Sequence, residues 1–76
     1  MGSVKHYPPE GFTERLYDEV LNSGLQITQI SKKTGIPRTT IYAYILNGTT
    51  PNATALAKLC EVLHVSADYL LFGKEG

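Results

Sequence analysis

The sequence predicts a small all-α domain of five short helices. Apolar residues recur three and four positions apart in successive segments, which is the spacing of an amphipathic helix. No segment shows the strict alternation of apolar and polar residues that is typical of a half-buried strand. Glycine, proline or a capping residue separates each segment from the next. With 76 residues, the chain is long enough for one domain and too short for two.

The first expected helix begins near Phe12 and ends before Gly24. Acidic residues occupy one side of this segment, and the other side carries its apolar stripe: Phe12, Leu16, Tyr17, Val20 and Leu21. Gly24 is a suitable C-terminal stop because glycine adopts the left-handed conformation at little cost. Residues 1–9, which precede the first helix, contain two prolines, and a loose N-terminal arm is expected there. Its first three residues are interpreted as the remnant of an expression tag.

A second, shorter helix is expected over residues 28–34. Thr28 is the predicted N-cap and Ile30 the inward-facing residue, and a start at Gln26 is the alternative. Gly35 ends this helix.

The third helix is expected from Arg38 to about Leu46. Pro37 lies just before it or at its first position, where the missing N–H of proline costs nothing. The predicted inward stripe consists of Ile41, Tyr44 and Ile45. Asn47 and Gly48 close the helix.

Two more helices complete the predicted fold. The fourth is capped by Thr50 or Asn52, and its apolar face consists of Ala55, Leu56, Leu59, Cys60 and Leu63. Ser66 caps the fifth helix, and Asp68 lies in its first turn, where a negative charge suits the helix dipole. The fifth helix continues through Tyr69, Leu70, Leu71 and Phe72 and ends at Gly73.

The most informative segment is residues 30–41, where two short helices meet through a turn of a few residues. Such helices cross steeply, and their close approach requires a small side chain, which Ser31 supplies. Gly35 supplies a residue that tolerates positive φ in the turn. The apolar contact between the helices is supplied by Ile30, Ile36 and Ile41. This pattern is typical of a helix-turn-helix, formed here by the second and third helices.

On these residues the chain resembles the lambda-repressor/Cro-type helix-turn-helix family, the DNA-binding domains of phage-type repressors. The resemblance covers residues 12–72, and it extends beyond the turn to Asn47, Gly48, Pro51, Asn52, Leu56, Leu59, the segment 63–66 and the segment 68–71. It implies a compact five-helix DNA-binding domain over residues 10–73. It also implies a cytoplasmic transcriptional repressor of phage or prophage type that binds a double-stranded inverted-repeat operator as a homodimer.

The chain departs from the family pattern at three places. Gln26 and Ile27 stand where the family commonly has Thr-Gln, whose glutamine contacts the DNA backbone. Pro37 stands where the family often has serine, and proline has no N–H to donate to a phosphate. Asn47 and Gly48 lie one residue later than usual, which predicts a slightly longer third helix.

Exposed residues of the third helix are expected to face the bases if that helix enters the major groove. Arg38 is the first candidate because a guanidinium donates two hydrogen bonds to O6 and N7 of guanine. The other predicted base contacts are Thr39, Tyr42 and Ala43. The predicted contacts to the DNA backbone are Thr28, Gln29, Lys32, Lys33, Pro37, Thr40, Asn47 and Thr49. For each polar or charged residue the alternative is an ordinary solvated or capping side chain.

The charge distribution is compatible with this interface. The formal net charge is zero, yet no acidic residue lies between Glu19 and Glu61. The same interval holds Lys32, Lys33, Arg38 and Lys58. This positive middle predicts a phosphate-facing surface, with chance distribution of a few charges as the alternative.

No enzyme, metal site or cofactor is expected. The single cysteine, Cys60, falls on an apolar helix face and is interpreted as a small buried hydrophobe. The two histidines have no third partner for a metal or a catalytic dyad. No apolar run approaches the length of a membrane span.

Self-association is expected at the apolar end of the domain, with a dimer surface drawn from Tyr69, Leu70, Leu71 and Phe72. Residues 74–76 are interpreted as a tail or the start of a linker to a C-terminal regulatory or dimerisation domain. Two other function classes suit the same fold. One is an antitoxin that binds DNA and a toxin protein, and the other is a protein-interaction module without DNA binding.

Overall fold

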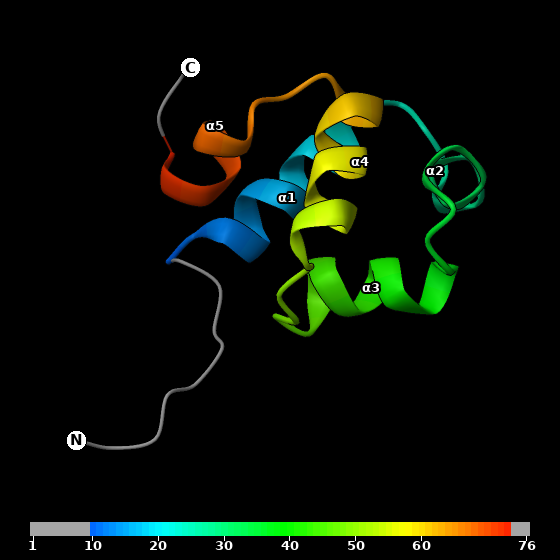
Figure 1. The fold of residues 1–76 in the computed structure, drawn as a ribbon, viewed down its shortest axis with the longest axis horizontal. Helices are drawn as coiled ribbons and strands as arrows, with labels where there is room; N and C mark the ends of the chain where they lie inside the picture. The colour runs from blue at the N-terminus through cyan, green and yellow to red at the C-terminus, as the bar shows by residue number, and fades with distance from the viewer. Residues whose placement is uncertain (1–9, 74–76) are drawn as a thin grey trace.

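The computed structural model describes residues 10–73, which contain five α-helices and no strand (Figure 1). The helices are α1 (Phe12–Asn22), α2 (Ile27–Thr34), α3 (Arg38–Leu46), α4 (Ala53–Leu63) and α5 (Ala67–Phe72). The predicted all-α class is therefore confirmed. The predicted arm, residues 1–9, and the predicted tail, residues 74–76, lie outside the described residues.

The helices surround one apolar core. Helix α1 packs against α3 and α5, α2 packs against α3 and α4, and α4 packs against α5. Figure 1 shows α3 along one edge of the molecule, with α2 at its N-terminal end and α4 rising from its C-terminal end. The fully buried side chains are Phe12, Leu16, Ile30, Ile41, Leu59 and Leu70. Every helix contributes to this cluster, and helices of 6 to 11 residues are too short to be stable without such packing.

Helix α1 buries a narrower stripe than its sequence suggests. Phe12, Leu16 and Val20 are buried, as predicted. The prediction was wrong for Tyr17 and Leu21, whose side chains are 39% and 61% exposed. The three buried residues repeat every four positions and form one row that faces the core, while the row that begins at Tyr17 faces away from it. The helix ends at Asn22, and Gly24 follows with a φ of 74°, as the stop signal predicts.

Helix α2 begins at Ile27, two residues earlier than an N-cap at Thr28 would place its start. The N-cap is Gln26, so the prediction of Thr28 was wrong and the alternative start was right. The carbonyl oxygen of the Gln29 side chain accepts a hydrogen bond from the Gln26 backbone N–H at 2.8 Å. This hydrogen bond is part of a capping box, and it satisfies the backbone N–H of the residue just before the helix. Ile27 then becomes the first helical residue and packs against the core.

The later helices begin and end where local signals predict. The Asn52 side chain accepts the Ala55 N–H at 2.8 Å, and the Ser66 hydroxyl accepts the Tyr69 N–H at 3.0 Å. These bonds cap α4 and α5, so Asn52 rather than Thr50 is the cap of α4. Gly73 ends α5 with a φ of 73°.

Arg15 joins the two ends of the described chain. Its Nε donates to the Leu70 carbonyl at 3.0 Å, and its Nη2 donates to the carbonyls of Leu71 and Glu10, each at 3.1 Å. The last carbonyls of a helix lack partners within the helix, and they form the negative end of its dipole. A cation on α1 therefore satisfies the C-terminal end of α5, a helix of six residues.

We predict that Arg15→Gln lowers the free energy of unfolding by about 1–2 kcal/mol, because the charge-assisted bonds to α5 are lost. Urea unfolding measures the loss, and hydrogen exchange should show the largest increase in α5. Arg38→Gln is the matched control, since Arg38 is exposed and bonds to no described residue. Equal stability of the two variants would contradict the assigned role of Arg15.

Candidate nucleic-acid interface

The turn between α2 and α3 is held by two side chains of α2. The Ser31 hydroxyl donates to the Ile36 carbonyl at 2.6 Å. The Ile36 N–H donates to the Thr34 hydroxyl at 3.1 Å, and that hydroxyl donates to the Ile30 carbonyl at 2.7 Å. Both backbone groups of the buried Ile36 are thus satisfied. We call this arrangement of Ser31, Thr34 and Ile36 the turn clamp.

The turn clamp determines where α3 begins. Gly35 takes the left-handed conformation, with a φ of 77°, and reverses the chain after α2. Pro37 is the N-cap, and its carbonyl accepts the N–H groups of Thr40 and Ile41, each at 3.0 Å. Ser31 was predicted at the helix crossing for its small size. The clamp adds a second reason for serine there, its hydroxyl, which the sequence alone did not indicate.

Helix α3 presents a polar N-terminal half on its outer side. Ile41, Tyr44 and Ile45 are buried, as predicted. Successive residues of a helix lie about 100° apart. Thr39 and Ala43 therefore point away from the buried stripe. Tyr42 lies on the side that faces α1, where it lines a hollow with α1 residues, and Thr40 lies on the side that faces α4.

The structure brings the predicted base contacts together on two adjoining sides of α3, the outer side and the side that faces α1. Arg38 and Thr39 are exposed in the first turn, Tyr42 is 44% exposed one turn later, and Ala43 is half-buried beside it. Arg38 bonds to no described residue, so its guanidinium keeps its donors available. The first turn of α3 is therefore the part of the helix that offers the most hydrogen-bonding groups to an external ligand.

The predicted backbone contacts fall into two groups. Thr28, Gln29, Lys32 and Lys33 are exposed on the side of α2 opposite to its buried residues. The second group, Pro37, Thr40, Asn47 and Thr49, lies at the two ends of α3, where Thr40 is half-buried and the others are exposed. The backbone N–H groups of Asn47 and Thr49 both bond to the Ala43 carbonyl at 3.1 Å. Only their side chains remain free to contact a phosphate.

Sequence reasoning did not identify a hollow that lies beside the turn. The hollow has a volume of about 240 Å³ and lies between the turn and the first half of α4. Lys58 lines it together with Asn52, Thr54 and Thr40. The position of Lys58 in the acid-free interval was the available signal, but only the fold brings this cation beside the N-terminal part of α3.

The predicted dimer surface requires one correction. Leu70 is fully buried in the core and cannot contribute to a surface. Tyr69 and Leu71 are partly buried against the core, and Phe72 is 62% exposed. The apolar residues of α5 are therefore divided between the core and the surface. Leu70 completes the core, and Phe72 is left on the surface.

Other chemistry has little support among residues 10–73. They contain no group of three or more His, Cys, Asp or Glu residues that is arranged to hold a metal ion. Cys60 is half-buried, and burial raises the pKa of its thiol, which is the opposite of what a reactive thiolate needs. No helix within that range is both long and apolar enough to cross a membrane.

Comparison with known families gave one match. A family model described as helix-turn-helix matches residues 16–70, which include α2, α3 and the turn clamp. Comparisons with curated proteins and with solved structures gave no match.

We predict that Thr34→Val destabilises the domain by about 1–3 kcal/mol. Valine has the shape of threonine but leaves the buried Ile36 N–H without an acceptor. Thr54→Val is the matched control because Thr54 is exposed on α4. Thermal or urea unfolding measures both variants. If Thr34→Val is no less stable than Thr54→Val, the clamp does not hold the turn.

Proposed function

Because the chain belongs to the Cro/C1-type helix-turn-helix family, it is a DNA-binding transcription regulator, and we propose that it represses transcription as a phage-type operator-binding dimer. The observation that carries this proposal is the outer side of α3. There the first turn is exposed, carries an arginine that bonds to no described residue, and is held in position by the turn clamp.

In this proposal, α3 enters the major groove and its first turn reads the bases. The groove admits an α-helix, and each base pair presents a distinct pattern of donors and acceptors there. Arg38 donates two hydrogen bonds to a guanine. Thr39 and Ala43 offer methyl groups to a thymine, and Tyr42 contacts a base or a phosphate at the edge of the same surface.

The backbone contacts would hold α3 in register. Lys32 and Lys33 supply positive charge from α2, and neutralised phosphates release counterions, so binding should weaken as salt rises. Thr28 and the free amide group of Gln29 lie at the N-terminal end of α2, where free backbone N–H groups also favour a phosphate. The remaining contacts, from Pro37, Thr40, Asn47 and Thr49, would follow the DNA strand along both ends of α3.

A dimer would place two recognition helices about one helical turn of DNA apart, which accounts for an inverted-repeat operator. We assign the self-association surface to Tyr69, Leu71 and Phe72 and exclude Leu70, because its side chain is buried in the core. Occupation of a promoter by this dimer would block transcription.

Selection of bound sequences from a random duplex library, at moderate salt, tests the proposal. We expect a two-fold-symmetric site to be enriched. In Arg38→Ala the preference at one base pair of each half-site should relax by about 1–3 kcal/mol. Lys33→Ala is the control, and it should weaken binding to all sequences alike. A folded wild-type protein that enriches no sequence would contradict the proposal, and an unchanged preference in Arg38→Ala would remove Arg38 as a base contact.

Sedimentation tests the dimer surface separately. Phe72→Asp should lower the dimeric fraction, because a charge would then have to be buried at an apolar contact. Phe72 is preferable to Leu71, which also packs against the core. Leu21→Asp is the control, since Leu21 is equally exposed, at 61%, but lies on α1. Unchanged association of Phe72→Asp would exclude this surface.

A further inference from the structure

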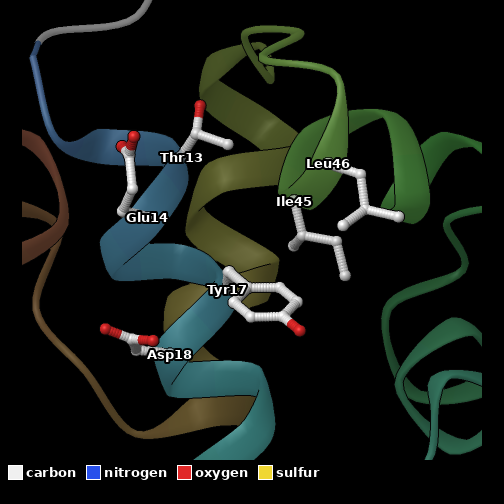
Figure 2. Close-up of a pocket in the computed structure, with 6 residues that line it drawn as sticks. All are labelled: Thr13, Glu14, Tyr17, Asp18, Ile45 and Leu46. Atoms are coloured by element: carbon white, nitrogen blue, oxygen red, sulfur yellow. The ribbon is translucent and has the colours of Figure 1, made fainter.

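A continuous apolar groove runs between α1 and α3, on a side of α3 that the predicted DNA contacts leave largely unused. Two hollows form it, with volumes of about 460 Å³ and about 500 Å³, and both are lined by Tyr17 and Ile45. Because they share these residues, they form one groove, which we call the α1–α3 groove. Figure 2 shows part of it, with Tyr17 between α1 and the Ile45 and Leu46 side chains of α3.

This groove gathers most of the large apolar surface that the fold leaves exposed. Of the five large hydrophobic residues exposed in the described chain, four line it: Tyr17, Leu21, Tyr42 and Leu46. Leu25 and Ile27 continue the apolar lining toward the start of α2. Exposed apolar side chains that occur singly need no explanation, but a contiguous set in a groove of this size is typical of a binding surface.

The edge of the α1–α3 groove on the α1 side is acidic. Glu14 and Asp18 line the first hollow, and both are exposed. They lie four residues apart, where like charges on a helix repel each other, and neither forms an ion pair with any residue from 10 to 73. No lysine or arginine lines either hollow. The groove therefore combines an apolar floor with carboxylates that form no ion pair within the described chain.

We propose that the α1–α3 groove is a docking site for a partner protein, and that the docked segment carries apolar anchor residues flanked by lysine or arginine. The apolar anchors would cover Tyr17, Leu21 and Leu46, and the flanking cations would pair with Glu14 and Asp18. The pairing relieves the repulsion between these carboxylates. The inference goes beyond operator binding and does not depend on it.

Charge also argues against two other occupants of the α1–α3 groove, DNA and a second copy of this chain. A DNA backbone would be repelled by Glu14 and Asp18, and Arg15, the cation of α1, is bonded to carbonyls at the end of α5. The other cations of the described chain lie on α2, α3 and α4. In a symmetric contact between two copies, the same patch faces itself, and no lysine or arginine lines this patch to pair with the acidic edge of the other copy. A basic segment of a different protein meets neither obstacle.

Selection from a library of random peptides displayed on phage, with the whole 76-residue chain as target, tests the proposal. We expect enriched peptides to combine large apolar residues with lysine or arginine. Synthetic copies should bind roughly ten-fold more weakly to the double variant Leu21→Ser, Leu46→Ser, as measured by fluorescence anisotropy. Phe72→Ser is the matched control and should bind normally, because Phe72 is as exposed as these leucines but lies on α5.

A second pair of variants tests the charges. The double variant Glu14→Gln, Asp18→Asn should weaken binding and reduce its salt dependence, while Glu61→Gln on α4 should change neither. Circular dichroism verifies that each variant is folded. The proposal is overturned if no peptide is enriched, or if the enriched peptides bind the groove variants as tightly as the wild type. It is also overturned if sedimentation shows that the leucine variants dissociate a dimer, since a second copy would then occupy the groove.

Discussion

The position of every α3 residue that is proposed to face DNA depends on how α2 holds the backbone of Ile36. Ser31 binds its carbonyl and Thr34 binds its N–H, so both backbone polar groups of Ile36 are satisfied and the turn has little freedom to change direction. Ile36 itself is buried, which adds an apolar contact to the same point. A recognition helix is useful only if its first turn is presented at a constant angle. In this domain two hydroxyl groups set that angle, and the left-handed conformation of Gly35 reverses the chain so that they reach the backbone of Ile36.

Helix α1 serves the fold with one side and leaves the other side free. Its buried row closes the core, and Arg15 extends the same support to the end of α5. The row that begins at Tyr17 faces the α1–α3 groove with acidic neighbours, while every cation of the described chain except Arg15 lies on the helices that follow. A chain of zero net charge therefore carries one positive surface, which is suited to phosphates, and one negative surface, which is suited to a basic protein segment.

Much of the candidate interface was predictable from the sequence because it depends on local signals. Pro37 marks the start of α3, and helical spacing separates its buried residues from Arg38 and Thr39. The sequence could not show that Lys58 approaches the turn, since α4 reaches that place only through packing. It also did not reveal the clamp role of Ser31, because a hydroxyl and a carbonyl five residues apart meet only when the turn has its final geometry.

The sequence by itself determined the class of the fold and the positions of most helix ends. Caps such as Asn52 and Ser66 act within a few residues, so their effect is local and can be recognised in the chain. Tertiary structure alone decided which apolar residues are buried. Periodicity indicates the residues that share a helix face, but the width of the buried stripe depends on how neighbouring helices cross it. For that reason Leu70 lies in the core, whereas Leu21 remains in solvent.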